Sequence, residues 1–374
     1  MSEKQQYAPG THPSLPPPAN TVGVIGWVRS NLLSSPSNVI LTILTVYFLY
    51  VIIPPTIHWL FLDAVFTSSS RAECREIEAA AGMDRGACWG FVTKRFGQFV
   101  YGYYPDPERW RADLAFFVLL ASLIPLLWDK TPKRRQCLYA TLAAPFVIYW
   151  LLTGGFGLEP IATDKFGGFL LTMVIGVTGI FFSLPLGILL ALGRQSNMPV
   201  LRIICVTFIE FIRGVPLITL LFVASTMLSY FLPPGTNFDL LLRVLIMVTL
   251  FSAAYIAEVV RGGLQAIPKG QQEAADAMGL KYWQSMRLII LPQALKISIP
   301  GIVNTFIGLY KDTTLVIVIG LFDLLGVARG TLSDTNWQAL STEVYIFVAI
   351  FFFISCMSMA RYSLYLEKKL HTGH

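Results

Sequence analysis

Residues 270–292 read GQQEAADAMGLKYWQSMRLIILP and form a long polar segment between two strongly apolar runs in the C-terminal half of the chain. Residues 271–278 are mostly good helix formers, Gly279 can end that helix in a left-handed conformation, and residues 281–291 can begin a second helix. The pattern predicts a helix, a sharp turn and another helix.

The composition of the first helix predicts that it docks against a partner outside the bilayer. Ala274 and Ala275 leave one face nearly bare, so that a partner's groove can approach closely, whereas Glu273 and Asp276 are costly to bury in lipid. The alternative is an interfacial amphipathic helix without a partner, but such helices carry large apolar residues on one face.

These positions resemble the signature loop of ABC importer permeases. The matching residues are Glu273, Ala274, Ala275, Gly279, Ile289, Leu291 and Pro292. In that family the loop is a cytoplasmic coupling helix that fits into the ATPase subunit. The resemblance implies a type I ABC importer transmembrane fold in the C-terminal part, and ATPase coupling through Glu273, Ala274, Ala275, Gly279, Leu291 and Pro292.

Composition gives the broad class of protein. Hydrophobic residues make up 55% of the chain and charged residues 13%, with a mean hydropathy of +0.62; soluble domains carry about 25% charged residues. The chain is therefore predicted to be an all-α polytopic membrane protein. The net charge of +6 does not indicate a nucleic-acid partner, because the Lys and Arg residues lie in short loops between apolar runs.

Apolar runs recur often enough to predict about eight transmembrane helices. The expected division is a cytoplasmic tail at 1–38, three extra transmembrane helices at 39–155 with a periplasmic loop at about 67–112, and an ABC permease core at 156–374 with its coupling loop at 270–292. The span that is expected to begin at Pro300 is short, and residues 315–327 form a second apolar piece after it. A broken or re-entrant element is predicted there.

The distribution of Lys and Arg orients these spans. Four basic residues lie between positions 129 and 136 and several more in the coupling loop, whereas residues 229–239 hold none. The basic loops are predicted to be cytoplasmic. An even number of spans then places both the N- and the C-terminus on the cytoplasmic side of a bacterial inner membrane.

Two of the five cysteines, Cys74 and Cys88, lie in the loop predicted to be external, where an oxidising compartment favours a disulfide. The alternative is two unrelated thiols. Cys137, Cys205 and Cys356 lie in or beside spans and are predicted to be packing residues. No residues in the sequence have the spacing of metal ligands.

Ionisable residues inside apolar spans are the candidates for a substrate site, since each is costly in hydrocarbon. Glu210 and Arg213 lie three residues apart and so share a helix face, and Gly214 and Pro216 should break that helix just beyond them. Counting ~1.5 Å per residue along each span places Arg213 and Asp312 near the middle of an approximately 30 Å hydrocarbon core. A cation and an anion are thus expected at one depth.

This pairing fits a zwitterionic substrate. Arg213 can hold an α-carboxylate in forked geometry, Asp312 can hold an α-ammonium, and the hydroxyls of Thr313 and Thr314 can complete the shell. The alternative is that Arg213 neutralises Glu210 or Asp312 and so holds two helices together.

Three other charged residues are not expected to bind substrate. Glu258 and Arg261 are also three residues apart, but they fall at the predicted membrane edge, so we expect an ion pair between them. Arg243, near the external end of its span, can extend its side chain toward the membrane surface.

Beyond the coupling loop, the chain resembles the polar amino acid branch of ABC permeases in FIEFIRGVPL at 208–217, AYIAE at 254–258 and KDTTL at 311–315. This resemblance covers about residues 167–366. With its extra N-terminal part, the chain is similar to the longer permeases of the general L-amino acid transporters of Gram-negative bacteria, most of all the M-type subunit. The resemblance implies a substrate site made of Arg213, Asp312, Glu210, Lys311 and Thr313.

The predicted function is that of a permease subunit of an ATP-driven importer of L-amino acids, not an enzyme. No Gly-rich stretch has the lysine of a phosphate loop, so ATP and Mg are expected on a separate ATPase. The resemblance implies as partners an ATPase subunit dimer, a second permease subunit, a periplasmic amino-acid-binding protein and the amino acid. A stand-alone secondary amino acid transporter is the alternative, but it would not need the coupling loop.

Overall fold

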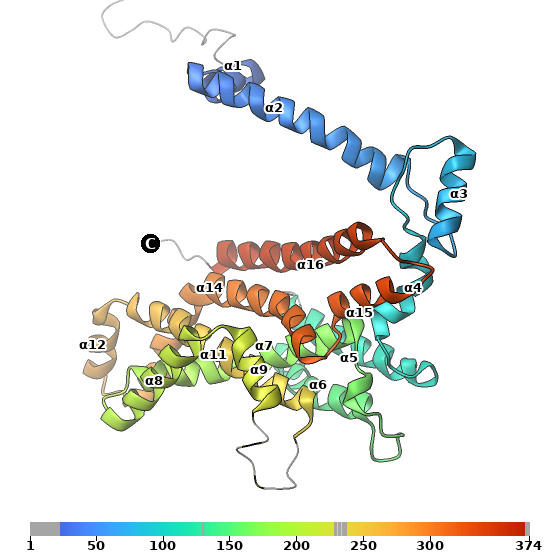
Figure 1. Ribbon diagram of the computed structural model, residues 1–374. Helices are drawn as coiled ribbons and strands as arrows, with labels where there is room; N and C mark the ends of the chain where they lie inside the picture. The colour runs from blue at the N-terminus through green and yellow to red at the C-terminus, as the bar shows by residue number, and fades with distance from the viewer. Residues whose placement is uncertain (1–22, 129–130, 228–229, 231–232, 234–237, 371–374) are drawn as a thin grey trace, which may run out of the picture. The chain divides into compact units, whose positions relative to one another are not determined.

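A computed structural model describes residues 23–128, 131–227, 230, 233 and 238–370 (Figure 1). The described residues form helices with short connections and hold isolated β-bridges but no named strand, which confirms the all-α prediction for them. Seven helical spans are long and apolar enough to cross a membrane, and a bent pair of helices makes an eighth if it counts as one span. Residues 1–22 of the predicted N-terminal tail lie outside the described residues.

The chain divides into two compact units. The first unit comprises Met1–Ser68 and Ala72–Trp89, and the second comprises Ser69–Arg71 and Gly90–His374. This division falls inside the predicted external loop and not at residue 155, because buried residues from the second and third extra spans join the same apolar cluster as the permease core. The functional boundary at residue 155 stays a prediction.

The first unit contains one long apolar helix and a small cross-linked cap. Its elements are α1 (Gly23–Asn31), α2 (Pro36–Ile57), the π-helical turn η2 (His58–Leu62) and most of α3 (Arg71–Ala81). The Ser35 side chain accepts the backbone N–H of Asn38 at 3.2 Å and so caps α2. No residue of α2 is buried within the chain, as is expected of a helix whose surface faces lipid.

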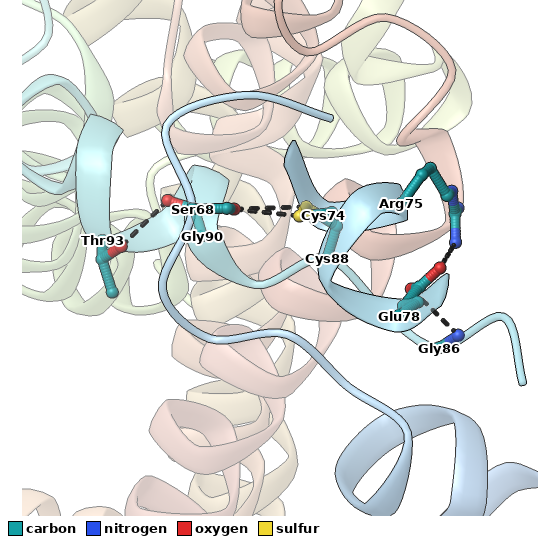
Figure 2. The surroundings of a disulfide bond; sticks show 8 residues. All are labelled: Ser68, Cys74, Arg75, Glu78, Gly86, Cys88, Gly90 and Thr93. Atoms are coloured by element: carbon teal, nitrogen blue, oxygen red, sulfur yellow. Dashed lines mark hydrogen bonds and ion pairs between the residues drawn. A yellow bond between two sulfur atoms is a disulfide. The ribbon is translucent and has the colours of Figure 1, made fainter. Parts of the chain in front are cut away.

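A disulfide between Cys74 and Cys88 closes the cap, with Cα atoms 6.0 Å apart (Figure 2). Both cysteines are fully buried, and the Ser68 hydroxyl lies 2.9 Å from the Cys74 sulfur. Glu78 accepts the backbone N–H of Gly86 at 3.2 Å. A Cβ at Gly86 would lie 1.8 Å from the carbonyl oxygen of Asp63, so only glycine fits at this turn.

The second unit holds the remaining helices. They are α4 (Gly90–Tyr101), α5 (Arg109–Leu127), α6 (Arg134–Thr153), α7 (Gly168–Arg194), α8 (Pro199–Gly214), α9 (Leu217–Thr226), α11 (Leu240–Gln265), α12 (Lys269–Ala277), α13 (Tyr282–Ser285), α14 (Leu291–Asp312), α15 (Leu324–Gly330) and α16 (Ser341–Leu370). Three short turns, η3 (Asp106–Glu108), η4 (Thr163–Lys165) and η7 (Thr331–Ser333), complete it together with η5 (Met286–Ile290) and η6 (Thr313–Ile319), which flank α14.

The α7 and α11 helices form the centre of this unit, and α14 packs against α11 on one side and α16 on the other (Figure 1). Small residues allow these close approaches. A Cβ at Gly187 of α7 would lie 2.6 Å from Ile256 of α11, and a Cβ at Gly263 would lie 2.5 Å from the carbonyl oxygen of Ala294 on α14. Larger residues at either position would force the helices apart.

Two predicted boundaries in the apolar spans are tested by the structure, and one of them is a real break. Helices α8 and α9 meet at a bend of 101°, which confirms the break predicted at Gly214 and Pro216. The short span expected from Pro300 is wrong: the helical span runs from Tyr282 to Ile319, with Pro300 inside α14. Proline is tolerated within a membrane helix because neighbouring groups satisfy the freed carbonyl, so it does not mark where this helix begins.

Candidate functional site

The coupling segment folds as predicted at its central turn. Gly279 follows α12 with a φ of +72°. Its N–H donates to the carbonyl oxygen of Asp276 at 2.9 Å, and the N–H of Leu280 donates to that of Ala275 at 3.1 Å. These two bonds make a Schellman motif, which satisfies the last carbonyls of the helix. The prediction of a left-handed cap at Gly279 is confirmed.

The two signature alanines of α12, Ala274 and Ala275, differ in what they face. Ala275 is 1% exposed, so it packs inside its own chain, and the expectation that both alanines form a bare outer face is wrong for this residue. Glu273 and Ala274 are exposed, as are the large side chains of Met278 and Trp283, at 77% and 66%. The outer surface of the segment is therefore polar along α12 and apolar around the turn.

Leu291 and Pro292 lie at a different place from the rest of the signature. They form the first turn of α14, directly after the π-helical turn η5. Both residues thus lie inside the continuous helical span Tyr282–Ile319, at the point where the π-helical turn gives way to regular α-helix.

A cluster of five charged side chains joins α7, α8 and α11. Glu258 on α11 lies at its centre and is 14% exposed; its carboxylate oxygens lie 2.9 Å from Arg194 Nη1, 2.8 Å from Arg261 Nη2 and 3.7 Å from Arg213 Nη1. Arg194, at the end of α7, also pairs with Glu210 at 2.8 Å. Three guanidinium groups thus face two carboxylates, which leaves the cluster with one excess positive charge.

Arg213 is the arginine of this cluster with the weakest interactions. Its guanidinium makes no hydrogen bond to any residue that the structure describes, and its nearest carboxylate oxygen, on Glu258, is at 3.7 Å. That carboxylate is already bonded by Arg194 and Arg261. The guanidinium carbon of Arg213 lies 5.5 Å from the ring centre of Tyr255, and the side chain is 35% exposed. It is therefore oriented by an aromatic ring while its donors remain available.

The second predicted group lies at the end of α14. Asp312 is half-buried and has no ion pair within the described part of the chain, and Lys311 beside it is exposed. The Thr313 hydroxyl donates to the carbonyl oxygen of Tyr310 at 2.9 Å, and that of Thr314 to Lys311 at 2.9 Å. Both hydroxyls are thus directed at their own helix.

The structure does not bring Arg213 and Asp312 together: among the described residues no hydrogen bond or ion pair joins them. Arg213 lies instead beside Glu258, which the sequence places at the membrane edge. The predicted depth of Arg213 in the membrane depends on α8 being part of one straight spanning helix. Instead, the chain bends by 101° directly after α8. The predicted alternative, neutralisation of Arg213 by Glu210 or Asp312, is also not what is seen, since its ion-pair partner is Glu258.

Sequence reasoning missed part of the cluster. The pair between Glu258 and Arg261 is confirmed, but the sequence analysis assigns no role to Arg194, and Tyr255 enters it only as part of the motif AYIAE. Arg194 and Glu210 lie on two consecutive apolar runs of the sequence, near the connection between them. This placement of opposite charges could have indicated that the two side chains meet. Within the described ranges no group of three His, Cys, Asp or Glu side chains could hold a metal ion.

Comparison with known proteins gives one family. Residues 183–372 match the family described as binding-protein-dependent transport system inner membrane component. The chain is 50% identical to the inner membrane amino-acid ABC transporter permease protein YhdY of Escherichia coli, with 97% of each chain covered. It is 47% identical to the glutamate/glutamine/aspartate/asparagine transport system permease protein BztC of Rhodobacter capsulatus, with 96% of each covered.

Shorter relatives match about half of this chain. The probable glutamine ABC transporter permease protein GlnM of Bacillus subtilis is 35% identical over 55% of this chain and 93% of its own. A solved structure titled as an amino acid ABC transporter with histidines is 30% identical, covers 54% of this chain and 92% of its own, and aligns with a TM-score of 0.49. The longer relatives thus match nearly all of this chain, whereas GlnM matches about half of it.

Proposed function

The chain belongs to the binding-protein-dependent transport system inner membrane component family and is a permease subunit of an amino-acid ABC importer; from this premise we propose that Arg213 grips the α-carboxylate of its substrate. The protein crosses the membrane several times, is not an enzyme, and depends on a separate subunit for ATP hydrolysis. A stand-alone secondary transporter is disfavoured, since the relatives are ABC permeases along nearly their whole length.

The observation that carries this proposal is the state of Arg213. Its guanidinium is held over Tyr255 with no hydrogen-bond acceptor among the described residues, in a cluster with one excess positive charge. A carboxylate that entered the cluster would balance the charge and accept the forked pair of N–H donors that only arginine offers. Asp312 would then attract the α-ammonium after a movement of α14 relative to α8.

We propose polar L-amino acids as the substrates, with acidic and amide side chains among them. The support is the relative of Rhodobacter capsulatus, whose name gives glutamate, glutamine, aspartate and asparagine and which is 47% identical to this chain. The excess positive charge of the cluster is consistent with anionic side chains as well as with the α-carboxylate.

The partners follow from the family in general terms: an ATPase and a binding protein. We propose further that the pore is completed by a second permease subunit, that an ATPase dimer carrying ATP and Mg docks on the exposed surface around Glu273, Ala274, Met278 and Trp283, and that a periplasmic protein delivers the amino acid. This arrangement places the coupling segment and both termini in the cytoplasm of a bacterium, with the chain in its inner membrane.

The test uses the complete complex, purified from native membranes with all its subunits. Reconstituted in proteoliposomes, it should import labelled glutamine only with ATP at the coupling side, and ion gradients alone should drive none. Labelled glutamine should also bind directly to the complex when the binding protein is left out. Unlabelled glutamine should compete for this binding, whereas its decarboxylated analogue should not, because it lacks the group that Arg213 holds. Competition by that analogue at equal strength would contradict the role of Arg213, and gradient-driven uptake would contradict the importer class.

A further inference from the structure

A large apolar cavity lies beside the permease core, between the α5–α6 hairpin and the central helices α7 and α11. Its volume is about 1120 Å³, and its walls include Phe116, Tyr149, Val177 and Leu245, one from each helix. Helices α5 and α6 pack closely on each other, whereas neither packs closely along α7 or α11. The hairpin contacts the core at one end, where Phe116 stacks on Phe169 of α7 with the two ring centres 5.4 Å apart.

The cavity is polar at one end only. Thr153, Thr163, Asp164 and Asp239 lie at the end where α6 finishes and α7 and α11 begin. The other walls are apolar except for Tyr149 and two threonines, and no Lys, Arg or His is among the described residues that line the cavity. An occupant should therefore have a long apolar body, and its one polar end should carry positive charge or hydrogen-bond donors.

The two carboxylates at this end are not equivalent. Asp239 is the N-cap of α11: it accepts the backbone N–H of Leu242 at 3.0 Å and the hydroxyl of Thr163. Asp164 is exposed and makes no hydrogen bond or ion pair with any described residue. Asp164 is thus free to bind a ligand, while Asp239 adds negative charge at a fixed position.

The depth of the cavity distinguishes a lipid from another transmembrane helix. On α6 the lining runs from Pro145 to Thr153, and on α11 from Leu241 to Leu250. At ~1.5 Å per residue these walls are about 12 to 14 Å deep, close to half of a hydrocarbon core of roughly 30 Å. On α7 the lining runs further, from Leu170 to Leu189 or about 28 Å, but the lining residues of α6 and α11 extend along only about half of that length. The part of the cavity that is walled on several sides is thus one leaflet deep and fits acyl chains, whereas a crossing helix would need facing walls of twice that depth.

We propose that this cavity binds a phospholipid whose head group carries a primary ammonium, as phosphatidylethanolamine does. The acyl chains fill the space between the hairpin and the core, where an unfilled gap would forfeit dispersion contacts. The ammonium donates hydrogen bonds to Asp164 and lies in the field of Asp239, while an anionic head group would be repelled by both carboxylates. With the coupling segment in the cytoplasm, the lipid belongs to the outer leaflet.

Site-specific photo-crosslinking in native membranes identifies the occupant. A photoreactive residue in place of Val177, within the cavity, should give an adduct with the mass of a phospholipid, and one in place of Ile350, exposed on α16, serves as the control for bulk lipid. The adduct at position 177 should be enriched in phosphatidylethanolamine relative to that at position 350. A peptide adduct, from α2 of this chain or from a second permease, would overturn the proposal, as would equal lipid composition at the two positions.

A second measurement tests the head group. Native mass spectrometry of the complex, purified in a mild detergent, should show bound phosphatidylethanolamine in preference to phosphatidylglycerol and to phosphatidylcholine, which lacks N–H donors. Asp164→Asn should reduce its occupancy roughly threefold, the scale of a partly exposed ion pair. Asp84→Asn, an exposed aspartate of the first unit, should leave it unchanged. No change in Asp164→Asn, or an equal change in both variants, would overturn the proposed head-group contact.

Discussion

The coupling segment and the arginine cluster each depend on a few residues. They differ in how far apart those residues lie in the sequence. The turn at Gly279 is made by hydrogen bonds between residues three and five apart. The cluster joins Arg194, Arg213 and Glu258 from three helices. Local geometry can be inferred from residue type, whereas the pairing of distant charges depends on how the helices pack.

The same difference predicts how each region responds to substitution. A change in the coupling segment should alter the contact with the partner and leave the chain folded, because its surface is exposed. A change at the centre of the cluster should first affect the packing of α7, α8 and α11, because Glu258 bonds across them. Arg213 is the exception within the cluster, since no hydrogen bond to another described residue holds it.

The largest effect is expected from Gly279→Val. A β-branched residue is strained in a left-handed conformation by at least 1 to 2 kcal/mol, roughly a factor of ten or more in the population of the native turn. Substrate-stimulated ATP hydrolysis by the reconstituted complex should be abolished. Gly279→Asn, which tolerates this conformation, should retain most of it. Normal coupling in an assembled Gly279→Val complex would show that the turn does not transmit the ATPase motion.

A smaller but substantial effect is expected from Arg213→Lys. Lysine keeps the charge but loses the planar fork, so the KM for the amino acid should rise by roughly one to two orders of magnitude, the scale of a lost bidentate contact. Basal ATP hydrolysis and thermal stability should be unchanged. Asp312→Asn should likewise raise the KM, because an amide attracts an ammonium far less than a carboxylate does.

The control for Arg213 lies within the same cluster. Arg194→Lys removes a guanidinium that pairs with both Glu210 and Glu258, so it should lower the melting temperature of the complex. Normal transport by both Arg213→Lys and Asp312→Asn would place the substrate site in the partner permease.

The next effect concerns the stability of the cluster. Glu258→Gln leaves three guanidinium groups around an uncharged amide, and breaking a buried ion pair on one side costs about 3 to 5 kcal/mol. Glu210→Gln should cost much less, because Glu210 is mostly exposed, at 54%. The melting temperatures of the two purified variants measure these two losses of stability. Equal losses would mean that Glu258 is not the centre of the cluster.

The disulfide should affect the first unit alone. Replacing Cys74 and Cys88 by serine opens a loop of about 15 residues, which corresponds to roughly 3 kcal/mol in the chain-entropy model. Hydrogen exchange should increase in residues 60–89 and stay unchanged in α7 and α11. Mass spectrometry without reduction provides the direct check, and free thiols at both positions in protein from oxidising membranes would contradict the cross-link.

The smallest effect is expected from Asp323→Asn in the connection between α14 and α16. Asp323 is fully buried and accepts the backbone N–H of Gly326 at 2.9 Å, and burial raises the pKa of its carboxyl from 3.8 to about 6. The folded chain therefore binds this proton more tightly than the unfolded chain. The stability contribution is complete below about pH 4 and is lost as the pH rises through about 6.

Asp323→Asn should remove this loss, so the fall in melting temperature between pH 5 and pH 7 should become smaller. The net effect should be about 1 to 2 kcal/mol, since asparagine can accept the same N–H as helix cap and removes the cost of the buried charge. The stability contribution of Asp334 changes with pH in the opposite direction. The N–H of Asn336, together with Arg95, lowers the pKa of this carboxyl, so its contribution is lost as the pH falls. An unchanged pH profile in Asp323→Asn would mean that this carboxyl does not titrate near pH 6.

The sequence by itself determined the helical membrane class, the bend at Gly214 and Pro216, and the left-handed cap at Gly279. Each depends on hydrophobicity or on the backbone preferences of one or two residues, which act over a few positions. Tertiary structure alone decided that Ala275 turns inward, that Arg213 pairs with Glu258 instead of Asp312, and that the α5–α6 hairpin leaves a cavity beside the core. These features depend on crossing angles and on small residues such as Gly187 that set how closely helices approach, and no local pattern in the sequence specifies them.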